Sequence, residues 1–281
     1  MPDKITIFSP GKLNIFLKVL GKRNDGFHFI RTGITFINLF DKIEIQKSNL
    51  TEVIYKGLFK PKKDKFDNCI MLKTLKFLNI YEKKFFKITV TKNIPVQGGL
   101  GSASTNAASL ILGLQSLNIV EKKDPKFYVS LGADIPCFLK QKNCIATGIG
   151  EILYSQIFPK YFFLLVKPKI NNSTEKMYKK LNLQVEPSNN DFYSDPSQFH
   201  EDDNGNTFET VALCEDKNFK EIFEFLQKLE YAIFTRMTGT GSCCFTAFTS
   251  KSHALEAHKI FKSKFSKLWS VVCENNFIKH N

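Results

Sequence analysis

The residues best suited to chemistry lie in an uncharged, glycine-rich stretch that ends in hydroxyl side chains. Glycine lets backbone N–H groups approach a ligand closely, and the first turn of a helix offers unpaired N–H groups with a partial positive charge. This combination is typical of an anion site, and phosphate is the usual anion. The same pattern also fits a tight turn with a serine or threonine N-cap. The stretch consists of Pro95, Val96, Gln97, Gly98, Gly99, Leu100, Gly101, Ser102, Ala103, Ser104 and Thr105.

The flanks of this stretch indicate a strand before it and a helix after it. Residues 85–90 alternate in polarity as a strand does, and residues 106–114 are mostly apolar and predict a helix. Neither common phosphate fingerprint fits, because Ser102 follows Gly101 where a P-loop carries lysine, and the stretch has no GxGxxG pattern. Taken alone, the stretch therefore leaves a phosphate site and a plain turn both open.

Two charged residues elsewhere in the chain could complete a reaction centre. Lys12 follows Pro10 and Gly11 and offers a point charge for a phosphate or a carboxylate, although an ordinary lysine of this lysine-rich chain is the alternative. Asp134 stands among small and apolar residues, where a carboxylate is costly to bury unless it is paired or hydrogen-bonded. It could act as a general base or as a helix N-cap. A cation such as Lys12 would keep it ionised.

An aromatic residue and a histidine follow a charged turn that contains two glycines. Phe27 and His28 could recognise a flat ring by stacking and hydrogen bonding, and a core aromatic beside a surface histidine is the alternative. Glycine loops also occur at residues 131–139 and 238–242. Because three such loops exceed what folding requires, we expect them to gather around one ligand.

An alternating series of strands and helices must position these residues. Pro10 and Gly11 predict a break after the first strand, and a polar run over residues 184–206 predicts a mobile loop. The second half of the chain has the element order of a ferredoxin-like α+β sheet. We predict strands at residues 5–8, 13–20, 33–38, 41–46, 85–90, 162–166, 243–248 and 269–273, with a hairpin at 143–155. We predict helices at residues 67–80, 105–117, 173–183, 207–213, 219–229 and 252–265.

Composition narrows the class of protein. The chain has 281 residues, 43% of them hydrophobic, and its longest apolar run, residues 161–166, is far shorter than the roughly 20 residues that cross a bilayer. The N-terminus lacks the apolar core of a signal peptide, so we expect a soluble, cytoplasmic protein. The seven cysteines form no CxxC pair, which disfavours a structural zinc site and a disulfide framework.

The net charge of +13 raises the question of nucleic-acid binding. Nucleic-acid contacts usually enlist arginine heavily, yet the arginines here are only Arg23, Arg31 and Arg236, and the lysines form no long basic tract. The charge therefore indicates a solvated, lysine-rich surface. Its positive field would also help to attract a polyanionic substrate.

Taken together, these motifs resemble those of the GHMP kinase superfamily. Two narrower motifs, at residues 21–28 and 131–136, are similar to the branch of this family that acts on a cytidyl diphosphate. The resemblance covers nearly the whole chain. The three superfamily motifs occur in order as Ser9-Pro10-Gly11-Lys12-Leu13-Asn14-Ile15-Phe16-Leu17, the glycine-rich stretch Pro95–Thr105, and Met237-Thr238-Gly239-Thr240-Gly241-Ser242-Cys243.

The resemblance implies an α+β fold of two domains and a kinase activity. Residues 1–156 would form the N-terminal, ATP-binding GHMP kinase domain, with a ribosomal-protein-S5-domain-2-like fold, and residues 157–281 a ferredoxin-like C-terminal domain. The implied reaction moves the γ-phosphoryl group of ATP, with Mg²⁺, to the tertiary 2-hydroxyl of 4-diphosphocytidyl-2-C-methyl-D-erythritol, in the non-mevalonate isoprenoid pathway. We expect small-molecule partners, no nucleic acid, no membrane, and a monomer or weak homodimer.

The resemblance also implies roles for individual residues. Asp134 would be the catalytic base with Lys12 as its partner, and Pro95–Thr105 would embrace the ATP phosphates, while the metal ligands stay open. Asn14 would contact the substrate near the reacting hydroxyl. The remaining substrate contacts would be Phe27, His28, Thr174 and Tyr178 around the cytosine, and Gly239, Thr240, Gly241 and Ser242 on the phosphate side.

The chain departs from the family pattern at a few positions. Gly11 stands where alanine is usual, Phe27 replaces a tyrosine and Tyr178 a phenylalanine, so that stacking is preserved. A segment that usually reads Asn-Asp-hydrophobic-Glu is here Asn206-Thr207-Phe208-Glu209; its aspartate is lost, and we assign it no role. Two alternatives stay open: another small-alcohol kinase of this fold, for homoserine or the mevalonate branch, and an RNA-binding protein, since the first domain is similar to a ribosomal protein domain.

Overall fold

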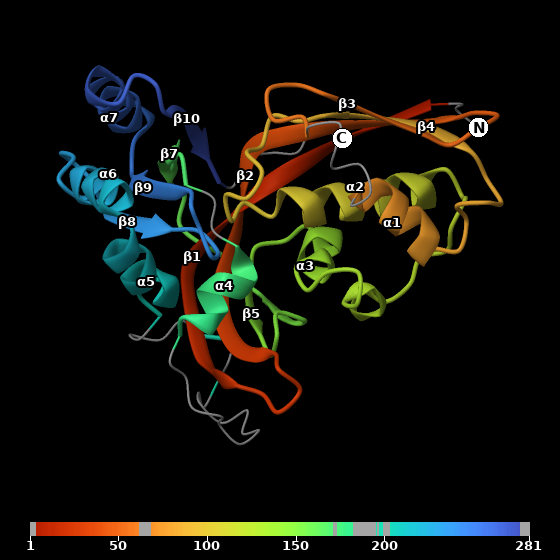
Figure 1. Ribbon diagram of the computed structural model, residues 1–281, viewed down its shortest axis with the longest axis horizontal. Helices are drawn as coiled ribbons and strands as arrows, with labels where there is room; N and C mark the ends of the chain where they lie inside the picture. Colours follow the sequence, from red (N-terminus) through yellow and green to blue (C-terminus); the bar gives the residue numbers. More distant parts are fainter. Residues whose placement is uncertain are drawn as a thin grey trace. The chain divides into compact units, whose positions relative to one another are not determined.

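The computed structural model describes residues 4–61, 69–170, 173–181, 195, 197–198 and 203–275 (Figure 1). The chain divides into two compact units. The first comprises Met1–Gly11, Leu39–Val96 and Gly101–Gln141, and the second comprises Lys12–Asn38, Gln97–Leu100 and Lys142–Asn281. The predicted domain boundary between residues 156 and 157 divides the chain differently and stays a prediction.

Two long strands, β1 (Lys4–Lys22) and β2 (His28–Lys47), contribute one part to each unit. The predicted break at Pro10 and Gly11 is wrong, because β1 runs through both residues. Among the strands that the structure describes, β1 pairs only with β2, and an edge strand tolerates proline because one side of it needs no ladder N–H donor; a single bridge to Asn206 occurs further along, at Leu17. The predicted separation of residues 33–38 from 41–46 is also wrong, since β2 continues through them.

The first unit is built from a sheet covered by helices. β4 (Phe86–Thr91) pairs in parallel with β3 (Glu52–Lys56) and antiparallel with β2. Parallel pairing requires a crossover connection, and the one between these strands contains α1 (Ile70–Phe77). The sequence patterns did not predict β3, which has only five residues. The first two residues of the predicted helix 67–80 lie outside the described residues.

The helix α2 (Ser102–Ser116) packs against the sheet of the first unit and begins earlier than predicted. A Cβ at Gly113 would lie 2.5 Å from Ile45 and 2.7 Å from Ile7, so this glycine permits the close approach of helix and sheet. Two short helices that the sequence did not indicate follow, η2 (Pro125–Tyr128) and α3 (Ile135–Lys140). The core of this unit consists of Ile43, Ile45, Cys69, Met71, Leu75, Ile80, Phe86, Ile88, Val90, Leu110, Leu114 and Leu117.

In the second unit, the predicted hairpin at 143–155 is confirmed. It is formed by β5 (Cys144–Thr147) and β6 (Ile152–Ser155), which pair antiparallel. β5 also pairs antiparallel with β2, where Gly33 lies opposite Ile145. This hairpin extends the part of the sheet that carries the first motif.

A separate four-stranded sheet in the second unit has the order β10 (Trp269–Glu274), β7 (Phe162–Lys167), β9 (Cys244–Phe248) and β8 (Phe234–Met237). All neighbours are antiparallel. In chain order the strands lie 4-1-3-2, which is a ferredoxin-like arrangement. Its helices are α4 (Thr174–Lys179), α5 (Thr207–Glu215), α6 (Lys217–Gln227) and α7 (Lys251–Lys264). The four-residue β8 was not predicted.

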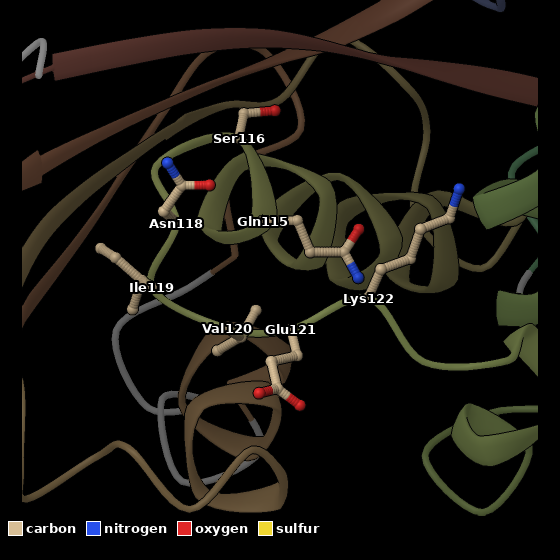
Figure 2. Close-up of a pocket in the computed structure, with 7 residues that line it drawn as sticks. All are labelled: Gln115, Ser116, Asn118, Ile119, Val120, Glu121 and Lys122. Carbon is tan, nitrogen blue, oxygen red and sulfur yellow. The ribbon is translucent and has the colours of Figure 1, made fainter.

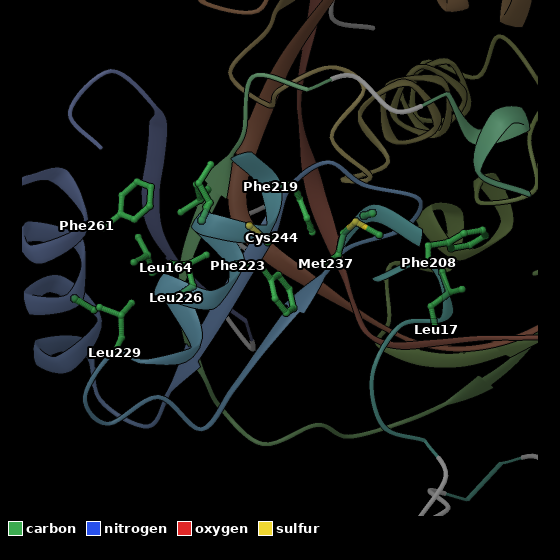
Figure 3. Close-up of a cluster of buried hydrophobic side chains, with 14 of the residues drawn as sticks. Leu17, Leu164, Phe208, Phe219, Phe223, Leu226, Leu229, Met237, Cys244 and Phe261 are labelled. Atoms are coloured by element: carbon green, nitrogen blue, oxygen red, sulfur yellow. The ribbon is translucent and has the colours of Figure 1, made fainter. Parts of the chain in front are cut away.

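Apolar side chains from this sheet and its helices form one buried cluster (Figure 3). Phe223 and Leu226 of α6 and Phe261 of α7 lie with Leu164 of β7, as the apolar face of α6 predicts. Phe208 of α5 lies beside Leu17 of β1 in the same view. The strand that carries the first motif is therefore packed into the core of the second unit.

The predicted loop over 184–206 lies mostly outside the described residues, but its last part is anchored. Asp203 accepts hydrogen bonds from Arg31 Nε at 2.8 Å and Arg31 Nη2 at 2.7 Å, and both side chains are fully buried. Within the described part of the chain, no helix has the length and apolar character to cross a membrane. The cytoplasmic location and the oligomeric state stay predictions.

Candidate active site

Lys12 lies buried on β1, with 4% of its surface exposed. Its ammonium donates a hydrogen bond to Asn14 Oδ1, and its backbone N–H donates to the Leu100 carbonyl at 3.1 Å. The first motif is therefore tied to the glycine-rich stretch. Such burial rules out the alternative of an ordinary surface lysine, because charged side chains are buried only where they are paired or hydrogen-bonded.

Asn14 joins the first motif to the third. Its Oδ1 accepts the Gly239 N–H at 2.9 Å in addition to the Lys12 ammonium, and its backbone N–H donates to Thr238 Oγ1 at 3.1 Å. Its Nδ2 donates to Thr32 Oγ1 at 2.7 Å. The Asn14 amide is thus engaged within the protein at both its oxygen and its nitrogen. The substrate contact that we expected for it stays a prediction.

Gly98 and Gly99 pack directly against the third motif. A Cβ at Gly99 would lie 1.9 Å from the Thr238 carbonyl oxygen, and a Cβ at Gly98 would lie 2.5 Å from Cys243 Sγ. The Cys243 N–H donates to the Gly98 carbonyl at 3.1 Å. Gly99 also has a φ of +75°, which L side chains rarely adopt. These glycines therefore serve the contact between two loops, a role that the sequence did not indicate.

The start of α2 belongs to the first unit and has the features of an anion site. Its N-cap is Gly101 at a φ of +69°, and no side chain caps it, so the first-turn N–H groups are not satisfied by a cap. Thr105 Oγ1 is buried and finds no hydrogen-bond partner among the described residues. The Ser102 hydroxyl, in contrast, accepts a hydrogen bond from Lys92. Ser104 is half-buried and Ala103 is exposed.

Lys92 and Asp41 form a buried network beneath the start of α2 that the sequence did not reveal. The Lys92 ammonium donates to the Asp41 carboxylate, to Ser102 and, at 2.7 Å, to Asn106 Oδ1. Asp41 Oδ1 accepts two backbone N–H groups that follow β4, the nearer at 2.7 Å. Burial lowers the pKa of Lys92, and Asp41 opposes that shift. The network fixes the residues on either side of the glycine-rich stretch.

Asp134 is the N-cap residue of α3 in the first unit. Its side chain makes no capping hydrogen bond, and it is half-buried. Asp134 therefore occupies an N-cap position, as the alternative interpretation predicted, but its carboxylate does not cap the helix. Lys12 belongs to the second unit, so the pairing of Asp134 with Lys12 stays a prediction.

The residues predicted around the cytosine lie in the second unit. The rings of His28 and Tyr178 are 4.5 Å apart between centroids, at an angle of 32°. The rings of Tyr178 and Phe208 meet at an angle of 80°, with 4.8 Å between their centroids. Phe27 is 56% exposed in a turn, where its N–H donates to Asp25 Oδ1 at 3.2 Å. Burial, with a smaller effect of Lys22, lowers the pKa of His28, which favours the neutral imidazole.

Two predicted substrate residues from distant segments meet at the third motif. Thr174 Oγ1 and Thr240 Oγ1 are 3.1 Å apart. Lys167, which no sequence motif singled out, supports the same loop because its Nζ donates to Ser242 Oγ at 2.6 Å and to the Ile170 carbonyl at 2.5 Å. Burial lowers the pKa of Lys167. Its place at the end of an apolar strand was the only signal in the sequence.

The segment that lost its aspartate is also close to the third motif. Asn206 Nδ2 donates to the carbonyls of Met237 and Gly239, each at 2.8 Å. The Thr207 hydroxyl accepts the Val19 N–H at 3.0 Å. Thr207, which stands where the family usually has aspartate, therefore contacts β1 through its hydroxyl. The sequence pattern assigned this segment no role.

A cavity in the described part of the chain lies at the C-terminal end of α2 and the residues that follow it (Figure 2). It has a volume of about 730 Å³ and is lined by Gln115, Ser116, Asn118, Ile119, Val120, Glu121 and Lys122. These residues are at the C-terminal end of α2, roughly 20 Å along the helix from Ser102. The cavity contains none of the predicted site residues.

Family models match both halves of the chain. The GHMP kinases N terminal domain matches residues 69–140, and the GHMP kinases C terminal domain matches residues 192–267. A crystal structure of 4-(cytidine 5'-diphospho)-2C-methyl-D-erythritol kinase has the same fold, with a TM-score of 0.75 at 22% identity over 97% of this chain and all of that one. The mevalonate kinase of Methanococcus jannaschii has a TM-score of 0.62 at 16% identity, covering 97% of this chain and 98% of that one. The chain belongs to the GHMP kinase superfamily.

Curated relatives narrow this assignment. The 4-diphosphocytidyl-2-C-methyl-D-erythritol kinase of Haemophilus ducreyi is 33% identical over 98% of this chain and 96% of that protein. The enzyme of the same name from Francisella philomiragia is 34% identical over 84% of each chain. Within the superfamily, the chain therefore belongs to the 4-diphosphocytidyl-2-C-methyl-D-erythritol kinase family. This membership favours a kinase over the RNA-binding alternative.

Proposed function

We propose that this protein transfers the γ-phosphoryl group of ATP to the tertiary 2-hydroxyl of 4-diphosphocytidyl-2-C-methyl-D-erythritol, in the non-mevalonate isoprenoid pathway. The observation that carries the proposal is the buried Lys12 ammonium on Asn14. Lys12 is bonded to Asn14 and, through its backbone, to Leu100 of the glycine-rich stretch. Asn14 is in turn hydrogen-bonded to Thr238 and Gly239 of the third motif. Such a meeting of motifs is what one shared substrate site requires, and the relatives named above support the choice of substrate.

The ATP phosphates would bind at the glycine-rich stretch and the start of α2. Supporting this are the uncapped first turn and the unpartnered Thr105 hydroxyl, which are donors of the kind that phosphate oxygens accept. Phosphoryl transfer depends on alignment and on charge neutralisation rather than on covalent chemistry by the protein. These donors would hold the phosphates in line with the acceptor hydroxyl.

Mg²⁺ fits this site as an ion that arrives with the nucleotide. Mg²⁺ is usually held by one or two carboxylates together with substrate phosphates. Within the described ranges, no group of three histidine, cysteine or acidic side chains is arranged to hold a metal, so this part of the chain provides no cage of its own. When bound, the ion would neutralise charge on the phosphates. We assign it no protein ligand.

Asp134 would accept the proton of the acceptor hydroxyl, with Lys12 as its cationic partner. Its carboxylate is half-buried and not used in capping, which suits a base that must face a substrate. Around the other end of the substrate, Phe27, His28 and Tyr178 would hold the cytosine. Thr174 and Gly239, Thr240, Gly241 and Ser242 would line the rest of the site.

An ATP-consumption assay with a panel of alcohols tests this function. The panel contains 4-diphosphocytidyl-2-C-methyl-D-erythritol, homoserine and mevalonate. We expect that, of the three alcohols, only the cytidyl substrate supports the consumption of ATP. We also expect CMP to inhibit the reaction, because Phe27, His28 and Tyr178 would bind the cytidyl group. Turnover of homoserine or mevalonate with no response to CMP would overturn the substrate assignment and favour another GHMP kinase.

A further inference from the structure

Asn206 does more than an N-cap of α5 requires. Its Oδ1 accepts the Phe208 N–H at 2.9 Å, and its own N–H donates to Glu209 Oε2 at 3.3 Å, which completes a capping box. An N-cap needs only an oxygen that accepts, and serine, threonine or aspartate would provide one. The Asn206 amide additionally donates to the Met237 and Gly239 carbonyls, so both N–H bonds of its Nδ2 are used.

Glu209 holds the same segment from its other side. Its Oε1 accepts the Met237 N–H at 2.7 Å, while Oε2 accepts the Asn206 N–H. The backbone donor and acceptor of Met237 are therefore both fixed by the capping box of α5. The start of the third motif is thus bonded to the start of α5 by side chains of two residues.

Gly239 passes this constraint on to the first motif. Its carbonyl accepts from Asn206 at 2.8 Å, and its N–H donates to Asn14 Oδ1 at 2.9 Å. The same Asn14 oxygen accepts the Lys12 ammonium. A continuous series of hydrogen bonds therefore runs from Asn206 through one glycine and one amide to the buried lysine, and every member lies in the second unit.

The start of α5 is also fastened to the strand that carries Lys12. The Leu17 N–H donates to the Gly205 carbonyl at 3.0 Å, and the Val19 N–H donates to Thr207 Oγ1 at 3.0 Å. Phe208 packs beside Leu17 in the core (Figure 3). Both ends of the series are thus held to β1, which limits how far Asn206 and Lys12 can move apart.

We propose that Asn206 is a positioning residue for Lys12, acting through Gly239 and Asn14. This inference depends on the catalytic role of Lys12 in the proposed function. The competing interpretation is that Asn206 serves folding alone, as the N-cap of α5. The two differ in what happens when the capping oxygen is kept and the amide donors are removed.

Asn206→Ser and Asn206→Asp make that separation. Both side chains retain an oxygen for the Phe208 N–H, but neither supplies the two amide donors, and aspartate also sets a carboxylate against two carbonyls. We expect kcat to fall roughly 10- to 100-fold, as small displacements of a catalytic group can cause, with KM for ATP unchanged. The larger loss should occur in Asn206→Asp.

Asp216→Ala is the matched control. Asp216 is the N-cap of the next helix, α6, and its Oδ1 accepts the Phe219 N–H at 2.8 Å, with no bond to the third motif. We expect Asp216→Ala to lower the midpoint of thermal unfolding and to leave kcat unchanged. The Asn206 variants should instead lose kcat, whatever the change in their midpoint of thermal unfolding.

Hydrogen exchange of the Gly239 amide supplies a readout that needs no turnover. We expect faster exchange of this amide in Asn206→Ser than in the wild type, with exchange in α6 unchanged. Wild-type kcat in both Asn206 variants, or unchanged exchange of Gly239, would overturn the inference. A wild-type protein that consumes no ATP would instead refute the proposed function, and the exchange measurement would still decide whether Asn206 holds Gly239. If Asn206→Asp does not fold, Asn206→Ser carries the test.

Discussion

Gly99 lies so close to Thr238 that a Cβ at Gly99 would be 1.9 Å from the Thr238 carbonyl oxygen. The glycine-rich stretch and the third motif are therefore in direct backbone contact. A hydrogen bond from Thr238 Oγ1 to the Gly99 carbonyl joins the same two segments, which are more than 130 residues apart along the chain. The sequence pattern assigns Gly99 to phosphate binding, but in the structure Gly99 is needed for the packing of one loop against another.

Gly99→Ala should destabilise the protein and disable it. The new Cβ would displace the Thr238 carbonyl, and the backbone at a φ of +75° would also be strained. Gly26→Ala is the control, because its φ is +88° but nothing lies within 4 Å of a Cβ there. We expect Gly26→Ala to cost about 1–2 kcal/mol of unfolding free energy and Gly99→Ala clearly more, measured by urea denaturation. Equal costs would show that the contact with Thr238 is unimportant.

Lys92→Met should be strongly destabilising because it leaves the Asp41 carboxylate buried without its cation. Removing one partner of a buried ion pair typically costs about 3–5 kcal/mol. Lys123→Met is the matched control, since Lys123 pairs with Glu121 on the surface, where the side chains are 53% and 87% exposed. An exposed pair contributes at most about 1 kcal/mol. Denaturation curves that show similar losses for both variants would contradict the role given to Asp41 and Lys92.

Asp134→Asn and Lys12→Ala should each lower kcat by roughly 10² or more, because general-base effects are typically 10²–10⁴, while ATP still binds. Lys4→Ala is the control on the same strand, because Lys4 is exposed and pairs with Glu44 at the surface. Steady-state kinetics and nucleotide-binding measurements on the three variants check this prediction. Near-normal turnover in the Asp134 or Lys12 variant would refute its assignment.

Phe27→Ala should raise KM for the cytidyl substrate and leave KM for ATP unchanged. The reason is the loss of a stacking surface worth about 1–3 kcal/mol per base, at a residue expected to contact only the cytosine. Phe8→Ala is a close control, because Phe8 is also a phenylalanine that is 56% exposed and lies outside the predicted site. If both variants behave alike, or if KM for ATP rises as well, Phe27 has no specific role at the ring.

Much of the fold could be predicted from local patterns. The period of apolar residues located α6 and β7, and residues 143–155 showed a hairpin. Short strands such as β3 and β8 carry too few residues to show a period. The continuity of β1 through Pro10 depends on its place at the edge of a sheet, and that is a property of the neighbouring strand rather than of the local sequence.

The site was predictable as a set of motifs but not as a network. Glycines and hydroxyls indicated an anion site, and the resemblance gathered Lys12 with the third motif. The hydrogen-bond partners of these residues could not be predicted. Asn14 and Thr238 are 224 positions apart, and Asn206 lies in a segment to which we assigned no role. Such bonds depend on tertiary packing, which places residues together that no local pattern relates.

The most direct test of the central claim is to identify the product of one reaction. The protein is incubated with ATP, Mg²⁺ and 4-diphosphocytidyl-2-C-methyl-D-erythritol, and the product is analysed by mass spectrometry and ³¹P NMR. We predict the addition of a single phosphoryl group, as a phosphomonoester on the tertiary 2-hydroxyl. A product phosphorylated at another hydroxyl, or the release of inorganic phosphate with the substrate unchanged, would contradict the claim.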